Sequence, residues 1–458
     1  MLDQQTTPLG ESATTASTRG WDTVYATTFD KVNSAIVKAG SSPDDFNQPG
    51  DDGESLVGTF GDWALKAGAG HLLTLDLPVP ELTLKLNDLA GDLQTYVRQD
   101  VTLSISVQLD CVPQPAAARA AKDNAMITGG TVHEFRLRLP HRDGANRMAE
   151  GPAVAVLDVS YPAKSGAHSQ PASTDAGEQD KVAAINLMFT DWINASGNLG
   201  KFNHAFGAVN LNGKISDKTR EEQGDFTWLL PVHTTYSVIS EGAGAGVFAI
   251  LCMCDDPEEG AAPRPVPTTT DISPTAIPQG KTSAFLISKE RFLSKIFFKG
   301  ASQVFARPEA DDSARVWPDD YFEVVASGNM IRNLHPLEVP DFKGRESDTP
   351  TTAHLPANGF NLTFEDHFLE VRFQDFSHPF WWFWYDAHHT FSARLDVDLD
   401  ATKHFVLKPL EDDDAAFHSA TLSKTKAGQA VDTALLVVDI LTVCAPFVAA
   451  GVGPMTKT

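Results

Sequence analysis

The sequence predicts a β-rich α+β protein in which curved antiparallel sheets each wrap around a long apolar helix. Two patterns carry this prediction. Short runs of alternating apolar and polar residues recur along most of the chain, which is typical of strands with one dry and one wet face. At residues 20–26 and 283–287, an apolar strand leads directly into an amphipathic helix. Such helices among half-buried strands indicate sheets curved around them, and a curved sheet can enclose an apolar tunnel.

The first helix is expected to begin at Thr27, whose hydroxyl can accept a backbone N–H of the first turn. Phe29, Val32 and Ile36 follow at helical spacing and form one apolar face. These three residues are the candidate lipid-binding residues of the first half, because they would border the tunnel. The same face can also fill a closed core, and for any single residue that interpretation is the simpler one.

Strands with period-two alternation dominate the rest of the first half, and helical spacing returns over residues 180–194. Cys252 and Cys254 lie two residues apart on a predicted strand, so both point to one face as small buried side chains. The predicted strands lie at residues 73–77, 82–86, 101–109, 135–139, 153–161, 226–239 and 247–253.

A proline-rich stretch divides the chain. It contains hardly any large apolar residue and predicts an extended linker, because it cannot hold a helix or a central strand. The predicted organisation is a disordered N-terminus at 1–19, a first half at 20–254, a linker at 255–281 and a second half at 282–458, which ends in an apolar helix.

The second half repeats the architecture of the first. Ser288 is expected to cap its helix, and Phe292 and Ile296 form the apolar face, which gives two more candidate lipid-binding residues. Further strands are predicted at 364–373 and 391–399. This is a weak internal repeat of architecture, with only loose sequence similarity between the halves.

An aromatic run between these two strands has two interpretations. Its rings can pack in the core or between domains. Alternatively, exposed Trp and Tyr side chains can sit at a lipid–water interface, where an apolar ring with a polar group is favoured. The candidate interface residues are Trp381, Trp382, Trp384 and Tyr385.

Composition limits the classes of partner. The 458 residues carry a formal net charge of −24, with a pI of about 4.9. An acidic chain repels phosphate backbones, so nucleic acid is not expected as a partner. Four cysteines without C-x-x-C spacing predict neither a zinc site nor a disulfide framework.

No membrane-spanning or catalytic motif stands out. The apolar stretch 440–453 is split by Pro446 and is shorter than the ~20 residues that cross a bilayer. Without an apolar leader, we expect a protein that is cytoplasmic or secreted without a conventional signal peptide. G-x-S-x-G, H-E-x-x-H and phosphate-loop patterns do not occur, so no catalytic residue, metal or cofactor is expected.

Two segments carry a family resemblance. Residues 20–36 and 284–293 resemble segments of the clostridial forty-seven-kilodalton and OrfX-type proteins, which are encoded beside botulinum neurotoxin genes. The resemblance covers most of the chain, from residue 19 to about residue 450. It implies a tubular lipid-binding fold of the TULIP superfamily, which includes bactericidal/permeability-increasing protein. In that fold a curved antiparallel sheet wraps a long helix and can shelter acyl chains, and the family brings no catalytic residues.

Two functional hypotheses follow. In the first, the chain is a non-enzymatic protein that binds a lipid or another apolar small molecule and serves as an accessory to a toxin complex. In the second, the core is closed and the chain is an interaction scaffold in a multi-protein toxin or secreted complex.

Overall fold

The computed structural model describes residues 16–88, 90–114, 131–138, 154–161, 176–195, 197–211, 228–242, 245–254, 265–273, 275–297, 305, 321–325, 330–342, 351–364, 368–380, 385–399, 405–409 and 418–423. The chain divides into two compact units, Met1–Leu286 and Ile287–Thr458. The predicted apolar C-terminal helix lies outside the described residues.

The first unit is built mainly of strands. Its elements are β1 (Thr23–Thr28), α1 (Phe29–Ala39), β2 (Asp45–Pro49), η1 (Asp51–Gly53), β3 (Ser55–Thr59), β4 (Ala64–Gly70), β5 (Leu72–Asn87), β6 (Leu93–Val107), β7 (Leu109–Pro113), β8 (Thr131–Leu137), β9 (Ala155–Ser160), α3 (Ala176–Asn194), η2 (Leu199–Lys201), β10 (Gly207–Leu211), β11 (Pro231–Gly242), β12 (Ala245–Cys254) and β13 (Ser283–Ile287).

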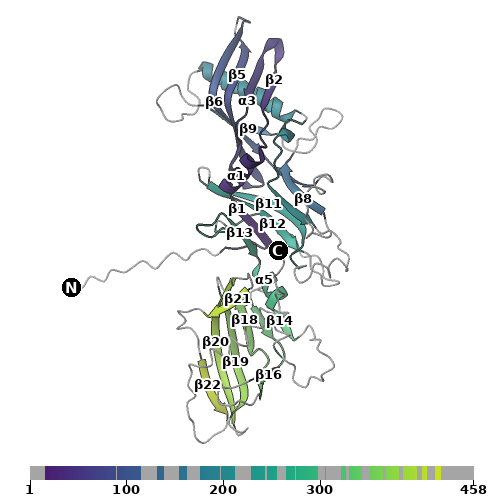
Figure 1. Ribbon diagram of the computed structural model, residues 1–458, viewed down its shortest axis with the longest axis vertical. Coiled ribbons are helices and arrows are strands. Elements are labelled where there is room, and N and C mark those ends of the chain that lie inside the picture. Colours follow the sequence, from purple (N-terminus) through teal and green to yellow (C-terminus); the bar gives the residue numbers. More distant parts are fainter. Residues whose placement is uncertain are drawn as a thin grey trace, which may run out of the picture. The chain divides into compact units, whose positions relative to one another are not determined.

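In the described part of this unit, ten strands form one sheet in the order β13-β1-β12-β11-β4-β5-β3-β2, with β6 joined to β5 and β9 joined to β6 (Figure 1). Eight of its strand pairs are antiparallel: β1–β12, β12–β11, β11–β4, β4–β5, β5–β3, β3–β2, β5–β6 and β6–β9. A smaller sheet has the order β10-β8-β7. The alternating residues of β5 and β6 bury one face, as the sequence predicts.

Helix α1 begins one residue later than predicted. Thr28 is the N-cap, and its hydroxyl accepts the N–H of Lys31. Thr27 still belongs to β1, where its Oγ1 lies 3.2 Å from Oγ of Ser283 on β13. The expectation that Thr27 caps the helix was wrong because this contact with β13, which is distant in sequence, extends the strand.

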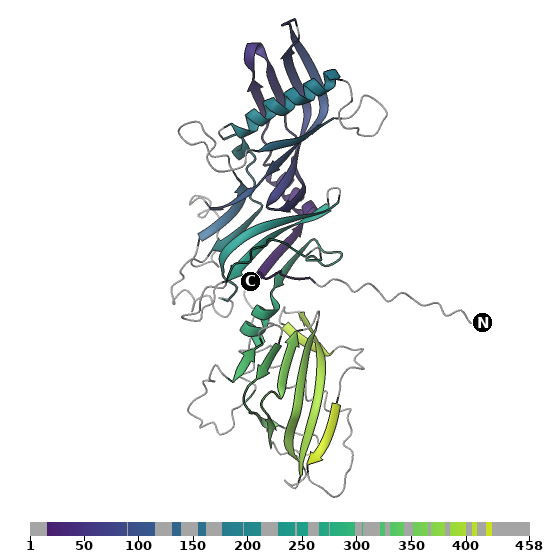
Figure 2. The ribbon, with the colours of Figure 1, turned by 180° about the vertical axis from the view of Figure 1, so that it is seen from behind.

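The long helix of the first unit is α3, and Figure 2 shows it crossing the strands at one end of the sheet. It packs on β2, β3 and β9. Its inner face buries Ile185, Phe189 and Trp192. The rings of Phe189 and Trp192 lie 5.2 and 5.4 Å from the ring of Phe46 on β2. The 180–194 periodicity therefore predicted a real helix, which begins at Ala176.

Part of the predicted linker packs against the first unit. Ile272 and Ala276 are buried in an apolar cluster with Trp21 and Leu251, on the side of β1 and β12 that faces away from α1. The indole N–H of Trp21 also donates to the carbonyl of Thr269, at 3.2 Å. Residues 265–281 hold no helix or strand in their described part, yet they cover this side of the sheet.

The second unit is also β-rich. Its elements are α5 (Lys289–Phe292), η4 (Leu293–Phe297), β14 (Phe322–Val324), β15 (Met330–Asn333), β16 (Leu337–Phe342), β17 (Thr351–Leu355), β18 (Phe360–Phe364), β19 (Leu369–Phe380), β20 (Tyr385–Leu399), β21 (Phe405–Pro409) and β22 (His418–Ser423). Nine described strands form its sheet in the order β14-β15-β18-β19-β17-β16, with β20 joined to β19, β21 and β22.

Ser288 caps α5 as predicted, since its hydroxyl accepts the N–H of Arg291. The helix is short and continues into the π-helical turn η4. Leu293 and Phe297 are its buried apolar residues, whereas Phe292 is only half-buried. The β-rich antiparallel fold class is confirmed.

Candidate functional site

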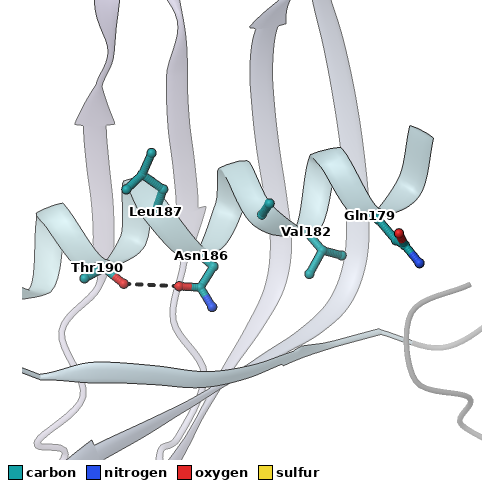
Figure 3. A pocket seen from close by; sticks show the side chains of 6 residues that line it. Gln179, Val182, Asn186, Leu187 and Thr190 are labelled. Carbon is teal, nitrogen blue, oxygen red and sulfur yellow. Dashed lines mark hydrogen bonds between the residues drawn. The ribbon is translucent and has the colours of Figure 1, made fainter. Parts of the chain in front are cut away.

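A pocket of about 490 Å³ lies along the outer side of α3. We call it the α3 pocket, and Figure 3 shows its side chains along three turns of the helix. Its lining residues are Gln179, Val182, Ala183, Asn186, Leu187 and Thr190.

The sequence places these residues on the side of α3 that the sheet does not cover. Ile185 and Phe189 point into the core, so side chains about half a turn away point outward. Leu187 is 64% exposed, which is high for a leucine, and Val182 is half-buried. The six lining residues carry no titratable side chain. The pocket therefore offers apolar contact and a few hydrogen bonds, and its lining supplies no acid–base chemistry.

The N-terminal end of α3 is fixed by an ion-pair network. The carboxylate of Glu178 accepts hydrogen bonds from Lys181 Nζ at 2.9 Å, from Arg98 at 2.6 Å and from the Tyr161 hydroxyl at 2.9 Å. The Lys181 ammonium, with Arg98 and Tyr161, lowers the pKa of Glu178 to about 2, although burial acts in the opposite direction. The Lys181 ammonium also lies 4.4 Å from the ring centre of Tyr96 on β6.

Two asparagines hold the rest of α3 to the backbone before and within β9. Asn194 accepts the N–H of Val154 at 2.8 Å and donates to the carbonyl of the same residue at 2.9 Å. Asn186 donates to the carbonyl of Val156 at 3.4 Å, and its Oδ1 accepts the hydroxyl of Thr190, as Figure 3 shows. The wall of the α3 pocket is thus anchored at both ends.

The predicted lipid-binding face of α1 lies in the core. Phe29, Val32 and Ile36 are 1%, 5% and 1% exposed, within a continuous apolar cluster. None of the three belongs to the α3 pocket. Phe29 also borders a smaller recess of about 240 Å³ beside Gly246 and Lys281.

The remaining predicted site residues belong to the second unit. Phe292 packs on Phe297 and Phe364, with ring centres 5.4 and 5.7 Å apart. Ile296 lies within η4, and nothing is described of its side chain. Trp381, Trp382 and Trp384 lie outside the described residues. Tyr385 begins β20, where its backbone pairs with Phe380.

The outer face of α3 was missed at the level of sequence. The helical spacing over residues 180–194 is dominated by Ile185, Phe189 and Trp192, which mark the buried face of the helix. The available signal was Leu187, an apolar residue that does not fit that spacing. Within the described residues, three or more His, Cys, Asp or Glu side chains nowhere gather as a metal site. No helix in the same ranges is long and apolar enough to span a membrane.

Solved structures share this fold. The structure of P47 from Clostridium botulinum E1 superimposes with a TM-score of 0.56 at 12% identity, over 94% of this chain and 89% of the other. P47 from Clostridium botulinum A2 gives the same score at 13% identity, over 94% and 86%. At this identity the likeness concerns the fold alone.

Sequence comparison adds relatives and a family. Protein OrfX3 of Clostridium botulinum (strain Kyoto / Type A2) is 27% identical over 302 residues, and Protein OrfX3 of Paraclostridium bifermentans is 24% identical over 303. Each alignment covers 65% of this chain and 56% of the relative, so the chain spans about half the length of these relatives. The profile described as "OrfX-like: Protein OrfX2/OrfX3/P47" matches residues 18–333. This chain therefore belongs to the OrfX-like family.

Proposed function

We propose that this chain is a non-enzymatic accessory subunit that binds a partner protein in a multi-protein assembly of the toxin type. The observation that carries the proposal is the packing of α1. Phe29 and Ile36, which would border an open tunnel, are each 1% exposed in a continuous core. A core packed in this way leaves the surface as the place for binding.

The outer face of α3 is the surface that we assign to the partner. Its centre is apolar, with Leu187 64% exposed and the uncharged α3 pocket beside it. Asp180 and Asp191 are exposed on the same helix and place carboxylates around that centre. An apolar centre with a charged rim is the usual anatomy of a protein interface. The acidic rim favours a partner whose matching surface is apolar with basic residues around it.

The test is a pull-down from the native host with the whole chain, compared between two variants. Leu187→Asp places a charge in the proposed interface. Val37→Asp is the matched control, because Val37 is 51% exposed on α1 and lies outside the α3 pocket. We expect the wild type and Val37→Asp to retain the same partner, identified by mass spectrometry, and Leu187→Asp to lose it. Equal capture by all three proteins would refute the role of α3.

A second candidate function is the binding of an apolar small molecule, such as an acyl chain, in the α3 pocket. The volume of about 490 Å³ and the apolar Val182, Ala183 and Leu187 favour it. Pockets for small ligands typically enclose about 300–1,000 Å³. Native mass spectrometry of the purified chain and titration with a fluorescent fatty acid test this function. Co-purified lipid, or uptake that Leu187→Asp abolishes, supports it, and the absence of both excludes a carrier role.

A further inference from the structure

A second pocket, of about 370 Å³, lies in the other unit, and all but one of its lining residues are polar or charged. It occupies the outer face of β15, β18 and β19, and we call it the β18 pocket. Arg332, Asn361, Thr363, Glu370 and Arg372 form its floor. Met330 adds one apolar side chain, and Asn358 and Gln374 lie at one end. Neither the candidate site on α3 nor the family resemblance accounts for it.

Strand register brings these side chains together. Arg332 pairs with Asn361, and Asn361 pairs with Arg372, so three polar residues stand in a row across three strands. In the next row on the same face, Thr363 pairs with Glu370. The intervening residues form the opposite face of the sheet, and Ile331, Leu362 and Val371 are buried there in the core. Because side chains alternate along a strand, the buried row fixes the polar rows in their outward position.

The end of the β18 pocket at Asn358 and Gln374 is held by hydrogen bonds. Asn358 has a φ of 59°, and its N–H donates to the carbonyl of Asn333. Asn333 is fully buried, donates to two carbonyls and accepts the N–H of Phe360 at 2.7 Å. On the other strand, Gln374 stands at an irregularity in the β19–β20 pairing, and its N–H donates to the carbonyl of Gly359. The pocket is therefore preformed.

Charges within the pocket are largely balanced. Arg332 is paired with Glu323, and Arg372 Nη2 lies 3.6 Å from Glu370. On the next strand, Arg394 pairs in register with Glu370, and its buried Nε has no hydrogen-bond partner among the described residues. A free anion would meet the Glu370 carboxylate inside the pocket. The lining is thus poorly suited to a simple phosphate or sulfate site.

The same lining suits a ligand that both donates and accepts. Guanidinium groups donate, carboxylates accept, and amide and hydroxyl side chains do both. In the β18 pocket these groups alternate on a fixed sheet surface at strand spacing. Sugar hydroxyls can each donate to one neighbour and accept from another. We propose that the β18 pocket binds a carbohydrate, whose hydroxyls bridge the Arg332–Asn361–Arg372 row and the Thr363–Glu370 pair. This proposal is independent of the function proposed for α3.

The test uses the full chain on an array of neutral and acidic glycans, followed by calorimetric titration with the free glycan that is best retained. Asn361→Ala removes the central amide, and Thr363→Val removes a hydroxyl at nearly constant shape. Thr83→Val on β5 is the matched control, because Thr83 is a half-buried strand residue in the other unit. Thermal melting checks that each variant is folded.

We expect a neutral or acidic glycan to be retained, with affinity at least tenfold lower for Asn361→Ala and Thr363→Val and unchanged for Thr83→Val. Inorganic phosphate should not displace it. Three outcomes overturn the proposal: no glycan is retained, the two pocket variants bind like the wild type, or phosphate competes and only acidic glycans bind. The last outcome identifies an anion site.

Discussion

At the scale of single residues, asparagines that bind backbone fix the positions of segments distant in sequence. Asn33 on α1 donates to the carbonyl of Leu65 and accepts its N–H, at the irregularity in the β4–β5 pairing. Asn194 binds Val154 in the same two-way manner. Side-chain amides replace a strand partner at these points because each carries both a donor and an acceptor.

Asn333→Asp tests this role in the second unit. The substitution replaces the amide that donates to the carbonyls of His335 and Pro356 with a buried carboxylate facing two acceptors. We expect a loss of about 3 kcal/mol in the stability of this unit, since a buried unsatisfied group costs ~1–3 kcal/mol and more when charged. Hydrogen exchange of β15 and β18 measures the effect. The exposed Asn47→Asp is the control, and equal protection in both variants would contradict the assignment.

Tyr236 gives a second prediction at this scale. Its hydroxyl donates to the carbonyl of His71 at 2.6 Å and accepts the N–H of Leu109 at 2.8 Å, which ties β7 of the small sheet to the large one. Tyr236→Phe leaves both backbone groups without that partner. We expect urea denaturation to show a loss of about 2 kcal/mol. The exposed Tyr25→Phe should be neutral.

Burial raises the pKa of Tyr236 to about 12. The folded value lies above the unfolded value of about 10, so the folded protein favours the neutral phenol. The stability that the neutral Tyr236 hydroxyl contributes is therefore complete below pH 10 and is lost as the pH rises toward 12. Tyr236→Phe should lack this alkaline loss.

At the scale of elements, close packing of α1 on the sheet depends on a glycine. A Cβ added at Gly246 would come within 2.5 Å of the Phe29 ring and of the Ile239 carbonyl. We expect Gly246→Ala to lower the melting temperature by several degrees, because overpacking costs about 1–3 kcal/mol. Gly61→Ala is the control, since its nearest contact would be an ordinary 3.4 Å to Pro78. Equal melting temperatures of the two variants would show that α1 can shift to accommodate the added methyl group at little cost in stability.

The attachment of α3 should weaken in acid. The pKa of Glu178 is lowered to about 2, so its folded value lies below the ordinary value of 4.5 for a glutamate. Its contribution to stability is therefore complete above about pH 4.5 and is lost as the pH falls toward 2. Hydrogen exchange of α3 at pH 6 and pH 3 measures this loss. Glu178→Gln should show weaker protection at pH 6 and a smaller change between the two conditions, and an acid response equal to the wild type would refute the role of Glu178.

At the scale of the whole molecule, net charge makes a further prediction. A net charge of −24 destabilises a compact chain through self-repulsion, which salt screens over about 8 Å at physiological ionic strength. We expect the melting temperature to rise between 10 mM and 150 mM NaCl. A fall would mean that local attractions, such as the one at Glu178, outweigh the general repulsion.

The sequence predicted those parts of the fold that are determined locally. Alternation over Leu73 to Leu77 marked β5, and helical spacing marked the buried face of α1 at Phe29, Val32 and Ile36. The β18 pocket could not be found in this way, because Arg332, Asn361 and Arg372 meet only through pairing of separate strands. The burial of α1 in a packed core also depends on Gly246, which lies more than two hundred residues away.

The place of β1 in the sheet has a consequence for how this protein is made. Thr23 pairs with Cys252, and on its other side β1 borders β13, where the N–H of Thr28 donates to the carbonyl of Thr282. Thr27 and Thr282 are 255 residues apart in the chain, so β1 cannot pair with both of its neighbours until the segment that carries β13 has been translated. Contacts so distant in sequence slow folding and leave an unpaired edge exposed in the meantime. A nascent chain that stops before β13 should accordingly be a target for chaperones.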